Sequence, residues 1–241
     1  MFQAIMIELL KSRRTHSFLI STIMMFVAFA WEIVVIKSEF AHPQLQNAGV
    51  FFNNQTVDCI ILPIAMSIFV ARIIGNEKEG MTFKLQGSNG TSIKRIFYQK
   101  LAFTMGIFFV LSILQNIQLP LSTILIHLSG EMLNVFILAC FTITLSMILK
   151  KQGLLMAFGF LGGFFGVVLS SKSSYLLSFL IPWIGSAYLA PYKFHLIDGT
   201  TYCYELDPQI FLRIILYFVF CVICYIFCKG VISNKEGFLY D

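Results

Sequence analysis

Long apolar runs alternate along the chain with short polar segments, and six of the runs are long enough to cross a membrane as helices. At 1.5 Å per residue, about 20 apolar residues span the roughly 30 Å hydrocarbon layer of a bilayer. The runs lack the alternating pattern of barrel strands. We therefore expect an all-α polytopic membrane protein with six transmembrane helices. These are residues Ser17–Ile36, Val57–Ile74, Leu101–Leu119 (or on past Pro120 to Ile126), Met132–Leu149, Gly153–Leu169 and Ile210–Phe227.

Composition supports this class and excludes others. Of the 241 residues, 58% are hydrophobic and 12% are charged, against about 45–50% and about 25% in soluble domains. This excludes a disordered chain, a nucleic-acid binder and an ordinary soluble enzyme. The residues outside the spans are too few for a separate soluble domain, so we expect a single membrane domain over residues 1–241.

The basic residues predict how the spans are oriented. With the N-terminus inside, 13 of the 17 lysines and arginines fall on the cytoplasmic side, in agreement with the positive-inside rule. Both termini are then cytoplasmic, and the net charge of +5 requires no nucleic acid. The triplet Ala28-Phe29-Ala30 is typical of a signal-peptide cleavage site, but the apolar run continues to Ile36, so we expect no cleavage.

Three segments outside the spans have features of their own. In residues 1–12, one helical stripe is apolar (Phe2, Ile5, Met6, Leu9 and Leu10), and Gln3, Glu8 and Lys11 lie away from it. This predicts an interfacial helix, or alternatively an extension of the first span. Residues 170–209 contain the apolar run Tyr175–Leu189, interrupted by Pro182. It is too short for a span and predicts an outer interfacial or re-entrant hairpin, unless its aromatic rings only anchor the headgroup region.

The third segment, residues 75–100, is the longest cytoplasmic loop. A short helix over Glu77–Gln86, a turn over Gly87–Gly90 and a second helix capped by Thr91 or Ser92 are expected. The helix would expose Glu77, Lys78, Glu79 and Lys84. This loop is either a docking site for a partner or a solvated connector.

Catalytic and metal-binding motifs are missing from the sequence. There is no phosphate-binding loop, because no Gly-Lys pair occurs, and neither His-Glu-x-x-His nor Gly-x-Ser-x-Gly is found. The four histidines are scattered and lack carboxylate neighbours at metal-ligand spacing, so we expect no metal site. Cys221, Cys224 and Cys228 share a helical face and should pack as small hydrophobes. Cys59 and Cys203 are both expected on the outer side, and the sequence does not decide whether they form a disulfide.

Polar residues within the spans are few. Glu32, Asp58 and, in the outer segment, Trp183 are the candidates for contact with a substrate. Glu32 and Asp58 are expected near enough to the outer interface to be hydrated. A proton-coupled transporter would require a carboxylate or a basic partner near mid-membrane, and we expect none there. In the fifth span, Gly159 with Gly163 and Gly162 with Gly166 form two Gly-x-x-x-Gly patterns, which predict close helix packing within the chain or against another subunit.

The order of these parts resembles a permease subunit of the type-two ABC exporters. The likeness rests on the topology of nearly the whole chain and on a degenerate motif over residues 72–101. Within the type-two exporters, length and the stretch Lys84–Gly90 are most similar to the lantibiotic-immunity branch, although a proline usual after the coupling helix is replaced by Gly87–Gly90. The motif residues are Glu77, Glu79, Gly80, Thr82, Leu85, Ser92, Arg95 and Lys100.

The resemblance implies a function. The chain would be a permease in a bacterial plasma membrane, with no catalytic residue or cofactor of its own. ATP and Mg²⁺ would be bound by partner ATPase subunits. A second permease, identical or homologous, would pack against the first and fifth spans, and an amphipathic peptide such as a lantibiotic would be expelled from the membrane lipid. Coupling to the ATPase would fall to residues 76–86, in particular Asn76, Glu77, Glu79, Gly80, Thr82 and Leu85.

Two other functions stay open. The chain could be a membrane sensor or scaffold that binds a partner and moves nothing, or a secondary transporter. Outer acidic residues outnumber outer basic ones, six to four, which would attract a cationic peptide. The positive-inside bias alone also accounts for that difference.

Overall fold

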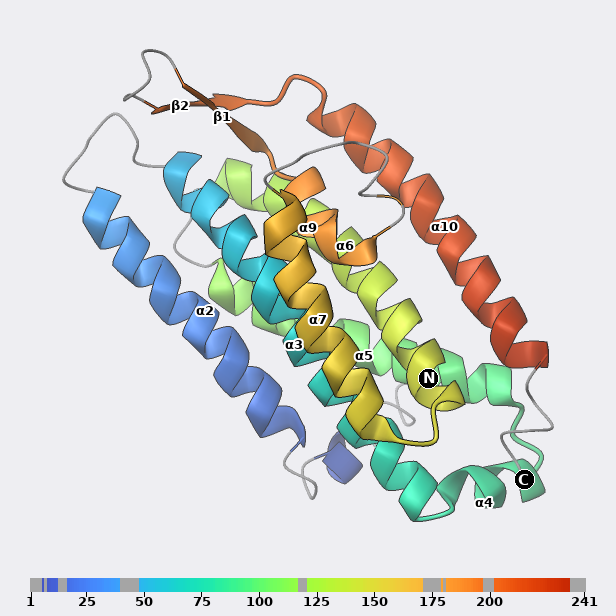
Figure 1. Ribbon diagram of the computed structural model, residues 1–241. Coiled ribbons are helices and arrows are strands. Elements are labelled where there is room, and N and C mark those ends of the chain that lie inside the picture. The colour runs from blue at the N-terminus through green and yellow to red at the C-terminus, as the bar shows by residue number, and fades with distance from the viewer. Residues whose placement is uncertain are drawn as a thin grey trace.

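The computed structural model describes residues 6, 8–12, 17–39, 48–116, 121–170, 179, 181–196 and 202–234. Six long helices run the length of a bundle in alternating directions (Figure 1). They are α2 (Ser17–Glu39), α3 (Ala48–Glu79), α5 (Ile93–Gln115), α6 (Leu121–Ile148), α7 (Gln152–Ser170) and α10 (Ile210–Asn234).

Short elements mark the two ends of the bundle. At one end, here the α4 end, lie the helix α4 (Thr82–Ser88) and the helical residues 8–12. At the other, the hairpin end, strands β1 (Tyr192–Leu196) and β2 (Tyr202–Leu206) pair antiparallel, with Tyr192 opposite Leu206. This hairpin departs from the predicted all-α fold.

Within the described residues, five helices are long and apolar enough to cross a membrane, judged by length and composition. In α2 the qualifying apolar stretch, Leu19–Trp31, is shorter. These helices fit the predicted membrane-embedded helical protein. The five segments are Val57–Glu79, Ile93–Gln115, Ile124–Ile148, Gln152–Leu169 and Ile210–Asn234.

Helix boundaries differ most from the prediction around α5. Its start at Ile93, after Ser92 in an extended backbone conformation, agrees with the predicted cap at Thr91 or Ser92, but the helix ends at Gln115 and not at Leu119. The next helix, α6, begins at Leu121, directly after Pro120. A third span continuing through Pro120 is therefore wrong. Proline lacks the amide hydrogen that a helix interior needs, and it is tolerated at a helix start.

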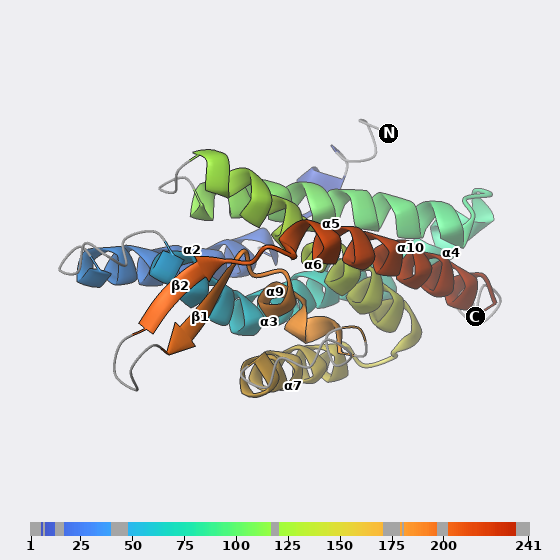
Figure 2. The ribbon, with the colours of Figure 1, turned by 90° about the horizontal axis from the view of Figure 1, so that it is seen from above.

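Helix α3 is the centre of the bundle. It packs against α2, α6 and α7, and Figure 2 shows α5 and α7 on opposite sides of it. Three aromatic rings build the core beside it: Phe69 lies 6.0 Å from Phe103 and 5.7 Å from Phe108, centroid to centroid. All three side chains are buried.

Of the four glycines in the two Gly-x-x-x-Gly patterns of α7, Gly159, Gly163 and Gly166 face α3, and Gly162 faces Trp183. A Cβ added to Gly163 would lie 2.7 Å from the Ile60 carbonyl oxygen, and one added to Gly166 would lie 2.9 Å from the Cys59 carbonyl oxygen. A Cβ on Gly159 would collide with the Ser67 side chain. The glycine face therefore packs within the chain, which answers the question that spacing left open.

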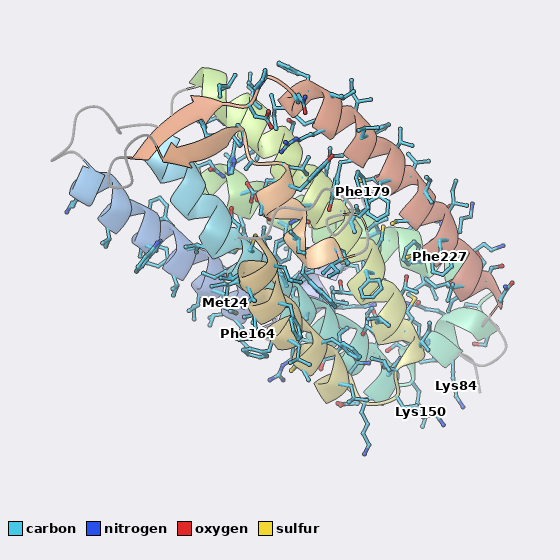
Figure 3. The ribbon with its side chains drawn as sticks, turned by 45° about the horizontal axis from the view of Figure 1, so that its top comes forward. Met24, Lys84, Lys150, Phe164, Phe179 and Phe227 are labelled. Atoms are coloured by element: carbon cyan, nitrogen blue, oxygen red, sulfur yellow. The ribbon has the colours of Figure 1, made fainter. Side chains whose placement is uncertain are left out.

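The opposite faces of α7 and α10 are apolar and exposed. Phe164 on α7 and Phe227 on α10 are 66% and 70% exposed and lie on outer faces of the bundle (Figure 3). Such surfaces suit contact with lipid tails or with another membrane helix, because neither offers hydrogen bonds.

The predicted outer segment, residues 170–209, is only partly described: residues 171–178, 180 and 197–201 lie outside the described part. Within it, the short helices η1 (Pro182–Ile184) and α9 (Gly185–Tyr188) pack against α3 and α6, and η1 also against α7. Directly after β2, Asp207 forms an ion pair with Arg213 of α10 at 3.1 Å, which links the segment to that helix.

Candidate functional site

A break in the helical backbone separates α3 from α4. The Gly80 amide donates to the Asn76 carbonyl at 3.0 Å, which closes α3, and Met81 then adopts a left-handed conformation with φ of 51°. A continuous helix over Glu77–Gln86 is therefore wrong. Left-handed backbone is costly for a residue with a side chain, so the surrounding contacts must hold this break in place.

The short helix α4 has one buried and one exposed side. Phe83 is buried in the main core, whereas Met81 and Leu85 are 64% and 61% exposed. Lys84 is exposed beside them (Figure 3). The helix runs through Gly87 to Ser88, and Gly90, with φ of +73°, makes the turn. We refer to Met81, Lys84 and Leu85 as the α4 patch.

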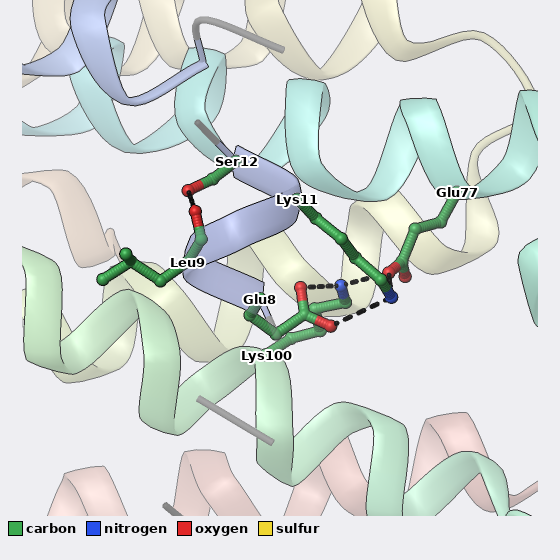
Figure 4. Close-up of polar contacts among 6 residues, drawn as sticks. All are labelled: Glu8, Leu9, Lys11, Ser12, Glu77 and Lys100. Atoms are coloured by element: carbon green, nitrogen blue, oxygen red, sulfur yellow. Dashed lines mark hydrogen bonds and ion pairs between the residues drawn. The ribbon is translucent and has the colours of Figure 1, made fainter. Parts of the chain in front are cut away.

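Behind α4, four charged side chains form a network that joins three parts of the chain (Figure 4). Lys100 Nζ of α5 lies 2.6 Å from Glu8 Oε2 and 2.7 Å from Glu77 Oε1 of α3. Lys11 Nζ lies 3.0 Å from Glu77 Oε1 and 3.5 Å from Glu8 Oε1. Two positive and two negative charges balance, as burial of charge requires.

Burial differs sharply within this charge network. The side chains of Glu8, Glu77 and Lys100 are 3–6% exposed, and that of Lys11 is 40% exposed. Burial lowers the pKa of Lys11, but the charges of Glu77 and Glu8 and its hydrogen bonds to them outweigh this, and the pKa is raised above its usual value. Lys11 therefore stays charged at neutral pH.

Two of the residues expected on the surface are held by the bundle. Glu77 is buried in the charge network, and Lys78 is half-buried. Lys78 Nζ donates to the carbonyl oxygens of Ser146, Met147 and Leu149, at 2.7, 2.8 and 2.8 Å. These are carbonyls at the end of α6, where a cation also interacts favourably with the helix dipole. Only Glu79 and Lys84 of the four charges are exposed as predicted.

A cleft of about 260 Å³ opens between residues 8–12 and the end of α3. Asn76 and Thr82, two of the predicted coupling residues, lie in its wall together with Glu77. The expected coupling residues thus separate into two groups. Asn76, Glu77 and Thr82 line the cleft, whereas Glu79, Gly80 and Leu85 are exposed.

The N-terminal segment turns its polar side towards the bundle and its apolar side outwards, the reverse of an amphipathic helix that packs on a protein core. Met6, Leu9 and Leu10 are exposed, and Glu8 and Ser12 are buried against the bundle. An apolar side turned outwards fits a helix in the membrane interface.

The predicted substrate contacts do not gather at one place that the structure describes. Trp183 is half-buried, lies against Gly162 and meets the Phe141 ring edge-on at 6.2 Å. Asp58 is 1% exposed and accepts a hydrogen bond from Gln115 at 2.9 Å. The expectation that Asp58 is hydrated is therefore wrong, because the neighbouring helices cover it. The side chain of Glu32 lies outside the described part.

The cysteines need no disulfide where they are described. Cys59, Cys140, Cys221 and Cys228 are buried free thiols, and Cys224 is a half-buried one. They pack as small apolar side chains. The side chain of Cys203 lies outside the described part, so its pairing stays untested.

Sequence reasoning did not assign Glu8 and Lys11 to this site. Both were placed on the polar side of an interfacial helix, and their distant partners carry no local signal. A hint was available: a carboxylate and a lysine three residues apart on the polar face of a short apolar helix suggest a partner for that face.

Comparisons with known proteins add nothing to this picture. No family model, no curated protein and no solved structure matches the chain.

Proposed function

We propose that the chain is the permease subunit of an ATP-driven exporter of the type-two ABC class, with α2 completing a set of six spans. The α4 end faces the cytoplasm, where basic residues concentrate. Partner subunits bind ATP and Mg²⁺ and hydrolyse the nucleotide. The cargo is an amphipathic peptide such as a lantibiotic, taken from the membrane and released outside, which would give resistance to it.

The observation that supports this proposal is the pairing of an exposed apolar patch with a rigid support behind it. Met81 and Leu85 have more than half of their surface exposed, although the helix that carries them is anchored by Phe83. Exposed large apolar side chains beside charged ones are typical of a protein–protein contact. A connector would need neither the patch nor the buried charges.

The support also offers a route for motion from α4 into the spans. A push on α4 displaces the end of α3. Glu77 there is bonded to Lys100 of α5 and to Lys11 of the N-terminal segment, and Lys78 is bonded to the end of α6. Closure of the partner ATPases would thereby tilt three spans together. No residue of this chain takes part in the chemistry of hydrolysis.

The test is purification of the tagged chain in mild detergent from cells that express its genomic neighbours, followed by mass spectrometry. We expect a stoichiometric partner with a phosphate-binding loop. Leu85→Glu should remove that partner and abolish resistance to the peptide, because it places a charge in an apolar contact.

Asn89→Glu is the matched control, since it adds the same charge to an exposed residue just after α4 and outside the patch. Substitution of Glu77 would be a poor test, because it leaves the buried Lys100 without one of its two carboxylate partners and disturbs the fold. Recovery of the chain without any ATPase would refute the proposal. A complex that forms but moves no peptide would favour a sensor.

A further inference from the structure

A second polar cluster lies at the hairpin end, far from α4, and joins α3, α5 and α6. One ligand atom from each of Asp58, His127 and Glu131 lies within 4.8 Å of the other two, and all three side chains are at most 4% exposed. His127 and Glu131 are four residues apart on one face of α6, with Nε2 3.8 Å from Oε2. The expectation that no histidine has a carboxylate at ligand spacing is wrong here.

From this geometry we propose that Asp58, His127 and Glu131 bind a divalent transition-metal ion of the Zn²⁺ type. Imidazole and carboxylate are both ligands of such ions. Two carboxylates buried at one place repel each other when both are ionised, and a divalent cation removes that repulsion.

An amide beside the three residues supports a ligand independently of them. Gln115 is 2% exposed and donates through Nε2 to Asp58 Oδ1 at 2.9 Å. Its other end, Oε1, has no hydrogen-bond partner within the described residues, and the same holds for Asp58 Oδ2. Buried oxygens are rarely left without a partner. A cation between the helices would supply one to both oxygens.

Neighbouring side chains already hold Glu131 in place. Ser112 of α5 donates to Glu131 Oε1, and Asn116 Nδ2 donates to Glu131 Oε2 at 3.1 Å. Hydrogen bonds of this kind orient carboxylate ligands around metals.

The distances between the three ligand atoms are slightly longer than those of a metal-bound site. In a tetrahedral site with bonds of about 2.0–2.2 Å, ligand atoms are about 3.3–3.6 Å apart. His127 and Glu131 need to approach by only a few tenths of an ångström from 3.8 Å. The ligand atom of Asp58 lies within 4.8 Å of the other two, so it must move by at most about 1.5 Å, which a side-chain rotation provides. The ion would then fix the hairpin ends of α3 and α6 to each other.

The test uses the full chain, purified in detergent without a polyhistidine tag and incubated with Zn²⁺ alone. We expect one Zn²⁺ per chain after buffer exchange, measured by mass spectrometry of the metal. We also expect a melting temperature that rises with Zn²⁺ and falls with a chelator. Co²⁺ in place of Zn²⁺ should give a visible absorption band from a nitrogen and oxygen site.

His127→Gln, Asp58→Asn and Glu131→Gln should each weaken Zn²⁺ binding by about 100-fold or more, and Gln115→Leu by about 10-fold or more. The control is the double variant Cys224→Ser and Cys228→Ser, which removes two thiols four residues apart on α10, since thiols are also zinc ligands. It should bind Zn²⁺ as the parent does. Size-exclusion profiles show which variants remain folded.

Three results would overturn the site: no stoichiometric Zn²⁺ on the parent chain, undiminished binding by folded His127→Gln, or loss of binding in the cysteine variant. Equal stabilisation by Ca²⁺ or Mg²⁺ would also overturn it, since those ions prefer oxygen ligands and would not use the imidazole. None of these results depends on the partner ATPase, so this proposal and the proposed function fail separately.

Discussion

Replacement of Gly163 by alanine tests the contact that brings α7 against the centre of the bundle. The new Cβ would lie 2.7 Å from the Ile60 carbonyl oxygen, and ordinary contact begins at 3.4 Å. Helix α7 must therefore move away by the difference, about 0.7 Å. Because the clash is with backbone, no side-chain rotation relieves it.

The expected size of the effect follows from two opposing terms. Overpacking of this kind costs about 1–3 kcal/mol, whereas alanine is favoured over glycine in a helix by up to about 1 kcal/mol. Gly106→Ala in α5 is the control, since a Cβ there meets nothing within 4 Å. The difference between the variants isolates the clash. It corresponds to a change of about 5- to 140-fold in the unfolding equilibrium.

The assay is reversible unfolding of the purified protein in mild detergent by added dodecyl sulfate. Tryptophan fluorescence reports on it, because Trp183 lies against Gly162, the residue before Gly163 in α7. Gly163→Ala should unfold at lower dodecyl sulfate than Gly106→Ala. If the two variants agree within about 0.5 kcal/mol, α7 does not approach α3 as closely as described, and the reasoning is refuted.

Two further predictions concern the charge network. Lys100→Met should destabilise the protein by about 3–5 kcal/mol, because it leaves two buried carboxylates with the half-exposed Lys11 alone; unfolding by dodecyl sulfate measures this, and a loss below about 1 kcal/mol would mean that the network is solvated. The raised pKa of Lys11 predicts a stabilisation that is complete below its unfolded pKa of 10.5 and lost as the pH rises through the higher folded value. The difference in melting temperature between the parent and Lys11→Gln should therefore be constant at neutral pH and narrow as the pH rises above 10.5, and a difference that stays constant there would contradict it.

Much of the fold follows from the sequence, because apolar run length is a strong signal for helices in membranes. Each of the six predicted runs lies largely within one long helix. Boundaries were less predictable. The start of α5 after Ser92 was predicted, but its end at Gln115 was not, because the apolar run continues to Leu119 and such a run does not mark where a helix ends.

The sites were less predictable than the helices. Glu77 was identified as important, but its exposure was wrong, because its partners Glu8 and Lys100 are far away in sequence. The cluster of Asp58, His127 and Glu131 was not predicted for the same reason, since it brings together residues from separate helices. Its one local sign, the four-residue spacing of His127 and Glu131, marks a shared helix face and was overlooked.

The contact of Glu8 with Lys100 spans 92 positions of the chain, which has a consequence for the order of assembly. A ribosome makes residue 8 long before residue 100. The carboxylate of Glu8 therefore has no Lys100 to meet until the third long helix has been synthesised and inserted. Contacts between distant residues close late, since the intervening chain must first be ordered. The N-terminal segment would reach its final place only after α3 and α5 stand together, so that its docking completes this end of the bundle and cannot begin it.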